Sequence, residues 1–293
     1  MCVRTGLALL VALPAALAAQ DVHVEWYGTT PEQGTVAYVV VETSAPVVAV
    51  RGTLAHAPLR FSRIDGERFA ALAGIAVSAP DTVVAQLQLE FATGRTTSLT
   101  RGLPVTGTRF PRERLSVDPR FTEQPDSALA ARIARERAMS RRVTAEALAT
   151  PRLWHEQFEA PRRSRITSGF GIGRVFNGQL RSRHLGVDYD GNVGDPIRAA
   201  NRGIVALVHK LYYSGGTVYV NHGGGLVTGY YHMSQMLVSV GDTVERGQII
   251  GRVGQSGRVT GPHLHWAVRV GSTAVDGRSL LALPPMESLY KKQ

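Results

Sequence analysis

The sequence predicts a mostly β protein, with a small β-sandwich-like domain, a helical connector and a C-terminal antiparallel β-sheet domain. A chain of 293 residues is long enough for two domains, each with its own core. Its hydrophobic content of 44% and charged content of 19% are those of a globular protein. Its 31 glycines exceed the usual share, and most of the excess follows Ser168, which indicates a turn-rich β architecture in the second half.

The N-terminal residues 1–18 have the pattern of an export signal. Residues 1–4 form a short basic start, and the apolar run over residues 6–18 is too short for an ordinary transmembrane helix. Small residues at 16 and 18 favour cleavage, so we expect a mature chain that begins near Ala19, with an uncleaved signal anchor as the alternative. The single cysteine, Cys2, lies inside this signal, which leaves the mature chain without disulfides or thiolate ligands.

The charge and hydropathy of the remaining chain restrict its partners. No later stretch is long and apolar enough to span a bilayer, so no stable membrane span is expected after signal cleavage. The formal net charge of +10 favours anionic partners such as wall polymers, membrane surfaces or nucleic acid, although it also serves solubility. Because the chain is expected to be exported, to the periplasm or the cell envelope and its exterior, envelope polymers are favoured and nucleic acid is not expected.

Residues 19–108 are predicted to form a β-sandwich of the immunoglobulin-like kind. Three runs, Thr35–Glu42, Val47–Leu54 and Val83–Phe91, are rich in β-branched residues and are separated by turn residues. In the last run the apolar residues alternate with polar ones, which is typical of a half-buried strand. Short strands at this spacing are typical of a sandwich.

Residues 109–160 are predicted to form a helical connector. Pro125-Asp126-Ser127 is a typical helix start, and the segment from Ser127 to about Ala149 is rich in helix-forming residues. Leu129, Ala130 and Ile133 predict a narrow apolar stripe beneath a basic exterior. We therefore expect a solvated helix packed between the domains rather than a nucleic-acid-binding helix.

Residues 161–293 are predicted to form the second, antiparallel β domain. A loop is expected from Val175 to Arg183, ahead of His184. Strand-like runs follow at Ile197–His209, Thr217–His222, Leu226–His232 and Gly261–Val270, the last with its strand beginning at His263.

Two short stretches of this domain carry the residues of a candidate metal site. On a strand, side chains alternate between faces, so His263 and His265 share one face while Leu264 and Trp266 face a core. In the same way, His184, Gly186 and Asp188 share a face opposite Leu185 and Val187. Imidazoles and a carboxylate are an N/N/O ligand set, which suits zinc in an open arrangement with a position left for water. His232 falls at another strand edge of the same glycine-rich domain.

Four stretches of the domain carry a resemblance to a known family. They are His184 to Asp188 (HLGVD), Val218 to Ser234 (VYVNHGGGLVTGYYHMS), Val240 to Gly251 (VGDTVERGQIIG) and Gly257 to Trp266 (GRVTGPHLHW). In order, spacing and context they resemble the LytM/lysostaphin-type zinc metallopeptidases of bacterial cell walls, over about Arg165 to Val270. The β-rich first half followed by a connector also resembles exported members of the family.

The resemblance implies a role for each residue that matches the family pattern. It makes His184, Asp188 and His265 the ligands of one zinc ion (Zn2+) per chain. His232 and His263 match two further active-site histidines, one as general base and the other holding the developing oxyanion. The base is expected to be His263, since it shares a strand face with His265, but the sequence leaves the assignment open. His222 is expected to be structural.

The function that these expectations imply is that of an exported zinc endopeptidase. Its substrate would be peptidoglycan, with hydrolysis in the stem peptides or crosslinks, a D-alanyl crosslink being expected rather than a glycine-type bridge. A non-catalytic relative that binds the wall or activates a hydrolase is the alternative, although such relatives typically lose metal ligands. A basic polyanion-binding protein with a structural zinc is a third reading, but structural zinc prefers four protein ligands. Whether the first domain targets the wall or covers the site stays open.

Overall fold

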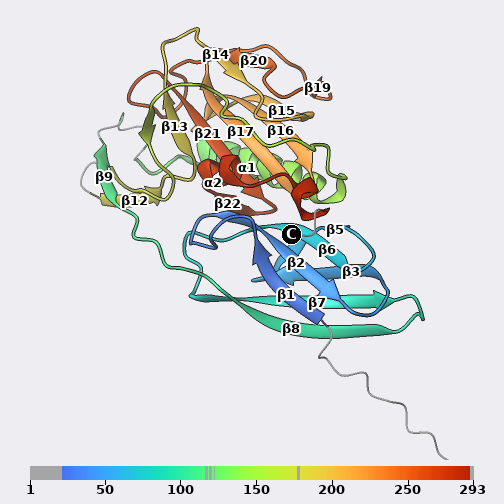
Figure 1. Ribbon diagram of the computed structural model, residues 1–293. Coiled ribbons are helices and arrows are strands. Elements are labelled where there is room, and N and C mark those ends of the chain that lie inside the picture. Colours follow the sequence, from blue (N-terminus) through green and yellow to red (C-terminus); the bar gives the residue numbers. More distant parts are fainter. Residues whose placement is uncertain (1–21, 116–117, 119–120, 122, 177–178, 291–293) are drawn as a thin grey trace, which may run out of the picture.

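The protein is mostly β, as predicted, and the computed structural model describes residues 22–115, 118, 121, 123–176 and 179–290. The predicted signal over residues 1–18 lies outside these described residues. A β-sandwich (blue to green in Figure 1) lies beneath a larger β domain (yellow to red), with a long helix against the latter.

Two four-stranded antiparallel sheets form the sandwich. One sheet has the order β1-β2-β6-β5 and the other the order β4-β3-β7-β8. The strands are β1 (Val22–Tyr27), β2 (Val36–Thr43), β3 (Val47–Leu54), β4 (Ala57–Leu59), β5 (Phe61–Arg63), β6 (Arg68–Gly74), β7 (Thr82–Phe91) and β8 (Thr96–Pro104). The three strands predicted from the sequence are therefore β2, β3 and β7.

The burial of β2 and β7 follows from their places in the sandwich. In β7 the residues Val83, Ala85, Leu87 and Leu89 are buried and those between them are exposed, so one face meets the facing sheet. In β2 six consecutive residues are buried, because Val39 and Val41 face the sandwich core while the alternate residues face the second domain. A strand covered on both faces has an apolar run without alternation.

The second domain is built on an eight-stranded antiparallel sheet of order β10-β13-β21-β17-β16-β15-β19, with β22 beside β21. Its strands are β10 (Ile166–Ser168), β13 (Val187–Asp190), β15 (Gly203–Leu211), β16 (Gly215–Gly223), β17 (Leu226–Met233), β19 (Thr243–Val244), β21 (His263–Val270) and β22 (Thr273–Val275). Strand β21 begins at His263, as predicted, and lies between β13 and β17 at the centre of the sheet.

Two small three-stranded sheets depart from the sequence expectations. The predicted loop from Val175 to Arg183 is wrong, because β11 (Gly173–Phe176) and β12 (Gln179–Arg183) pair there, and β11 also pairs in parallel with β9 (Arg112–Leu115) of the connector. The single strand expected over Ile197–His209 is also wrong. The predicted run is divided between two sheets. β14 (Pro196–Arg198) belongs to a small sheet with β20 (Ile249–Arg252) and β18 (Gln235–Met236), whereas β15, which follows it in the chain, belongs to the large sheet.

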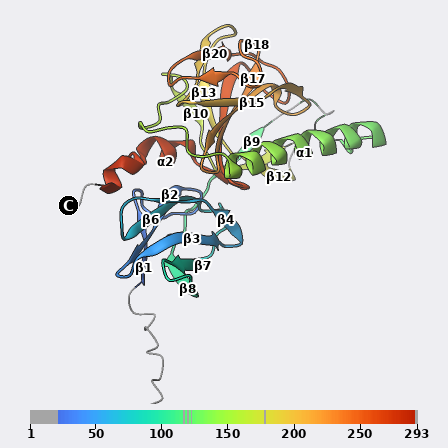
Figure 2. The same ribbon diagram turned by 90° about the vertical axis from the view of Figure 1, so that its right-hand side faces the viewer.

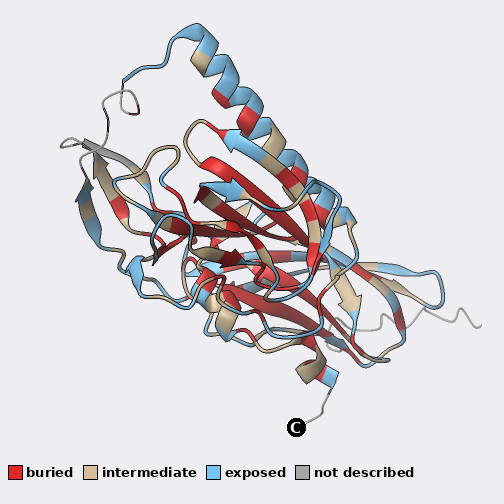
Figure 3. Cartoon of the chain, turned by 90° about the horizontal axis from the view of Figure 1, so that it is seen from above, coloured by how far each residue is buried: buried red, intermediate tan, exposed pale blue. Residues whose placement is uncertain are grey.

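The predicted helix is α1 (Ser127–Ala149), and the side chain of Asp126 caps it by accepting a hydrogen bond from the backbone of Leu129 at 2.8 Å. Its predicted place between the domains is wrong. Its buried residues include Ile133, Val143 and Ala147, and the last two pack on apolar side chains of β15, β16 and β17. The helix packs there because one face of the large sheet needs an apolar cover. Most of its other residues are exposed to solvent (Figure 3).

The C-terminal segment joins the two domains. Helix α2 (Gly277–Ala282) and the 3₁₀ helix η3 (Met286–Tyr290) follow β22, and the red segment lies above the sandwich in Figure 2. Leu283 and Tyr38 belong to one buried cluster that continues from β2 and β6 into the second domain. The hydroxyl of Tyr38 donates to the carbonyl of Pro284 at 3.2 Å, and the hydroxyl of Ser279 accepts from the backbone of Val36 at 3.0 Å.

Candidate metal centre

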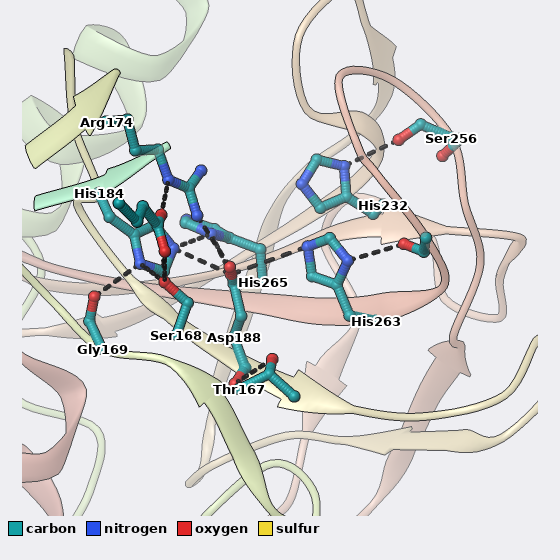
Figure 4. A network of polar contacts seen from close by, with 12 residues as sticks. Thr167, Ser168, Gly169, Arg174, His184, Asp188, His232, Ser256, His263 and His265 are labelled. Carbon is teal, nitrogen blue, oxygen red and sulfur yellow. Dashed lines mark hydrogen bonds and ion pairs between the residues drawn. The ribbon is translucent and has the colours of Figure 1, made fainter. Parts of the chain in front are cut away.

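Three neighbouring strands of the large sheet position most of the candidate site. Asp188 on β13 is directly opposite His265 on β21, and Tyr231 on β17 is opposite His265 on its other side. The predicted alternation along β21 is confirmed, since Leu264 and Trp266 are fully buried in the core. His263 and His265 therefore lie on the face that Asp188 shares (Figure 4).

His184 reaches the site from outside a regular strand. The sequence reasoning placed it on one strand with Asp188, but β12 ends at Arg183 and β13 begins at Val187. Backbone hydrogen bonds between His184 and the segment Gly171–Ile172, at 2.7 and 2.8 Å, hold it instead. Leu185, expected to face the core, is 37% exposed for the same reason: a loop does not alternate as a strand does.

His184, Asp188 and His265 bring three potential ligand atoms together. The Nε2 atom of His184 lies 2.9 Å from Asp188 Oδ1 and 2.9 Å from His265 Nδ1, and the latter two atoms are 2.8 Å apart. All three residues are buried.

The hydrogen bonds around this group indicate that it fits a cation. His184 Nδ1 lies 2.7 Å from the carbonyl oxygen of Gly169, which can only accept, so Nδ1 carries the proton and Nε2 presents a lone pair. That lone pair faces Asp188 Oδ1, which is also an acceptor. Two buried acceptors in contact are unfavourable unless a proton or a metal ion lies between them. Two imidazoles and a carboxylate are donors that zinc accepts.

Burial and neighbouring groups lower the pKa values of two of these residues, His265 and Asp188. Burial lowers the pKa of His265 to about 4, although Asp188 opposes this. Burial would raise the pKa of the Asp188 carboxyl, but its contacts with His184 and His265 hold it well below the usual range. Protons therefore compete weakly for the side chains of His265 and Asp188 near neutral pH.

Two further residues hold the ligands in place, and the sequence reasoning did not find either. Arg174 on β11 donates to Asp188 Oδ2 at 2.9 Å, which leaves Oδ1 to the ligand group. The ring of Tyr231 stacks on His265 with centroids 5.0 Å apart and an interplanar angle of 10°. Partners of this kind orient metal ligands. Pairing of the predicted strands could have placed Tyr231 beside His265. The position of Arg174 could not be predicted, because it lies on β11, where a loop was expected.

His232 and His263 lie side by side next to the ligand group, with ring centroids 4.9 Å apart. His263 Nδ1 donates to the carbonyl of Gly261 at 2.9 Å, and His232 Nδ1 donates to the carbonyl of Ser256 at 2.8 Å. These contacts use Nδ1 and leave Nε2 of each ring to the site, and that of His263 is 3.8 Å from Asp188 Oδ1. Burial, with the charges of His263 and His265, holds the pKa of His232 well below its usual value.

A left-handed backbone conformation brings His232 into the site. Regular alternation after Tyr231, which stacks on His265, would turn His232 to the opposite face of the sheet. His232 instead has φ of 63°, which is uncommon for a residue with a side chain, and the pairing of β16 with β17 is irregular nearby. This local strain is the physical reason that strand periodicity alone does not place His232 in the site.

Gly186 is expected to tolerate no side chain. A Cβ atom there would collide with the ring of His265 and lie 2.7 Å from the carbonyl oxygen of Trp266. We expect Gly186→Ala to weaken zinc binding by roughly 10–100-fold, the range found when partners that orient ligands are lost. Zinc titration of the purified variant measures this, with Gly107→Ala as a control because Gly107 has open space around it. Equal affinity in wild type and Gly186→Ala would contradict this packing role.

His222 makes its described contacts away from the ligand group. Its ring lies in β16, where Nδ1 donates to the carbonyl of Arg202 at 2.7 Å and Nε2 lies 2.8 Å from Thr228 Oγ1. Burial lowers its pKa to about 4, against 6.5 ordinarily. On acidification the unfolded chain takes up this proton first, so the His222 contribution to stability is lost as the pH falls from about 6.5 to about 4.

The loss of stability from His222 is expected to reach about 3 kcal/mol at about 1.4 kcal/mol per pKa unit. Denaturant unfolding of the metal-free protein at a series of pH values measures it, and His222→Gln serves as the comparison. Wild type should lose more stability than His222→Gln across this range. Parallel stability curves would show that His222 does not titrate in this way.

Comparison with known proteins agrees with the site. Residues 182–277 match peptidase family M23. The peptidoglycan DD-endopeptidase ShyC of Vibrio cholerae is 38% identical over 130 residues, which are 44% of this chain and 30% of that protein. The DD-carboxypeptidase/endopeptidase Mpg of Neisseria meningitidis is 38% identical over 124 residues, which are 42% of this chain and 28% of that protein. The chain thus spans about three tenths of the length of these relatives.

A solved structure extends the likeness to nearly the whole chain. A Pseudomonas aeruginosa protein assigned to peptidase family M23 superposes with a TM-score of 0.64 at 27% identity, over 86% of this chain and 95% of that one. The second domain is accordingly a metallopeptidase domain of the LytM/lysostaphin type. The likeness to peptidase family M23 is shown for this domain, over residues 182–277.

Proposed function

We propose that this protein is an exported zinc-dependent endopeptidase that hydrolyses peptide bonds in the stem peptides or crosslinks of peptidoglycan. The observation that carries the proposal is the convergence of His184, Asp188 and His265 on one point, with two further histidines beside it. The name of ShyC, a peptidoglycan DD-endopeptidase, supports the same substrate, and that of Mpg, a DD-carboxypeptidase/endopeptidase, supports the same kind of bond.

His184, Asp188 and His265 would hold one zinc ion, with Arg174 and Tyr231 fixing Asp188 and His265. When bound, zinc supplies Lewis acidity for peptide hydrolysis and lowers the pKa of water to roughly 7 in well-known cases. His263 is the proposed general base, because its Nε2 lies 3.8 Å from Asp188 Oδ1 and its side chain is partly exposed. The low pKa of His232 keeps its ring neutral, with Nδ1 hydrogen-bonded to Ser256. The neutral ring would orient a reacting group by accepting a hydrogen bond at Nε2. It would stabilise an oxyanion only after it has taken up a proton.

The cell envelope is the proposed place of action, in the periplasm or outside the cell, after removal of residues 1–18. Within the described residues, the structure contains no helix that is both long and apolar enough to cross a membrane. A basic net charge of +10 suits a protein that works on an anionic wall polymer.

A non-catalytic wall-binding or activating role is the weaker alternative. Such a role needs no proton-accepting histidines, whereas both His232 and His263 lie beside the ligand group and use only Nδ1 for their hydrogen bonds to carbonyls. The five site positions are all occupied by residues that can take part in hydrolysis.

Digestion of purified sacculi tests the proposed function. The chain from Ala19 onward, loaded with zinc, should release muropeptides, and mass spectrometry of the new termini should show cleavage at a D-alanyl crosslink. The chelator-treated protein and His263→Ala are the matched inactive controls. Intact sacculi with the zinc-loaded protein would contradict the proposal, and new glycine termini would contradict the choice of bond.

A further inference from the structure

A cavity of about 250 Å³ opens directly beside the candidate metal centre. Asp188 and His263 form the side that belongs to the centre, and Arg174, Arg258 and Glu113 form much of the rest. The two arginines come from different parts of the domain, β11 and the loop before β21. A peptide bond held near His263 would therefore place its neighbouring groups in this cavity.

The cavity already holds a carboxylate, that of Glu113 in the connector. Arg174 Nε donates to Glu113 Oε1 at 2.9 Å, and Ser168 Oγ donates to Oε2 at 3.2 Å. Glu113 reaches this place because β9 pairs in parallel with β11, with Glu113 opposite Arg174. The cavity thus has hydrogen-bond donors that bind a carboxylate. In this structure they bind Glu113, which is 61 positions away from Arg174 in the sequence.

Arg258 adds a second positive charge, held in a defined position. Its backbone donates to the carbonyl of Tyr213 at 2.9 Å, and its guanidinium lies over the Tyr213 ring, 4.8 Å from the centroid. Ser256, two residues earlier, donates through Oγ to Met233 and accepts from the backbone of Gly216. Burial lowers the pKa of Arg258, and the charge of Arg174 acts in the same direction. Arg258 therefore brings a positive charge to the wall of the cavity that Arg174 and Glu113 also line.

We propose that this cavity is a subsite for a free carboxylate next to the scissile bond of the peptide substrate. Arg258 selects that carboxylate, and Glu113 is an internal carboxylate that occupies the same subsite and must leave it. The inference rests on the proposed peptidase function for the identity of the ligand as a peptide. Charge-assisted hydrogen bonds from arginine give such a site its preference for an acid over an amide.

Binding to the full zinc-loaded chain with His263→Ala tests the subsite without turnover. The probes are N-acetyl-D-alanyl-D-alanine and its C-terminal amide, compared by isothermal titration calorimetry. We expect the acid to bind about ten-fold or more tightly than the amide, the range of one charge-assisted hydrogen bond. Adding Arg258→Gln should remove the preference, Arg258→Lys should keep part of it, and Arg198→Gln, at a distant basic position, should not change it.

Glu113→Gln provides an independent arm of the test. Without the competing carboxylate, the acid should bind more tightly while the affinity for the amide changes little. Equal binding of acid and amide, or an unchanged preference in Arg258→Gln, would overturn the subsite even if sacculi are cleaved. Uncleaved sacculi together with a preference that depends on Arg258 would instead overturn the peptidase function and leave the subsite standing.

Discussion

Replacement of His184 or His265 by alanine is expected to abolish both zinc binding and hydrolysis of sacculi. Each contributes one of the three atoms that lie 2.8–2.9 Å apart. Loss of one leaves Asp188 buried with a single imidazole partner and too few donors to hold the ion. Because loss of a mere supporting partner costs roughly 10–100-fold, loss of a ligand should lower zinc affinity by more than about a hundred-fold.

Metal analysis after dialysis and a sacculus-release assay measure the two effects in the same preparations. His209→Ala is the matched control, since His209 is an exposed histidine on β15 and should retain both properties. Circular dichroism of each variant separates loss of metal from loss of fold. A His184→Ala protein that is free of metal yet fully active would contradict the assigned role of zinc.

Replacement of His263 by alanine is expected to remove activity while zinc stays bound. The ring lies beside the ligand group but presents its Nε2 at 3.8 Å from Asp188 Oδ1, so it is placed to accept a proton rather than to bind the ion. Loss of a positioned general base typically slows a reaction by about 10²–10⁴-fold. His232→Ala should behave similarly, because His232 contacts His263 and lies outside the ligand triangle.

The same two measurements, zinc content and release of muropeptides, separate these variants from the ligand variants. A stoichiometric zinc content with a rate reduced by the expected factor supports a role in proton transfer. If His263→Ala lost its zinc, the residue would be a ligand instead, and if it kept its full rate it would have no part in the reaction.

Periodicity made part of the site predictable from the sequence. His263 and His265 share a face because β21 is a regular strand, and the buried Leu264 and Trp266 confirm its alternation. The strand β7 and the helix α1 were predictable for the same reason, since each follows one local period over many residues.

The rest of the site depends on tertiary contacts that no local period encodes. Backbone hydrogen bonds with Gly171 and Ile172 place His184, and a left-handed φ turns His232 toward the other histidines. Arg174 and Glu113 meet because two segments far apart in the chain pair in parallel. For His184 and His232, the resemblance to a known family supplied what periodicity did not.

Anomalous diffraction from crystals of the zinc-loaded protein, recorded at the zinc absorption edge, tests the central claim most directly. We expect one zinc peak per chain, about 2.0–2.2 Å from His184 Nε2, Asp188 Oδ1 and His265 Nδ1. A peak bound by other residues, or none at this triangle in a protein that cleaves sacculi, would contradict it.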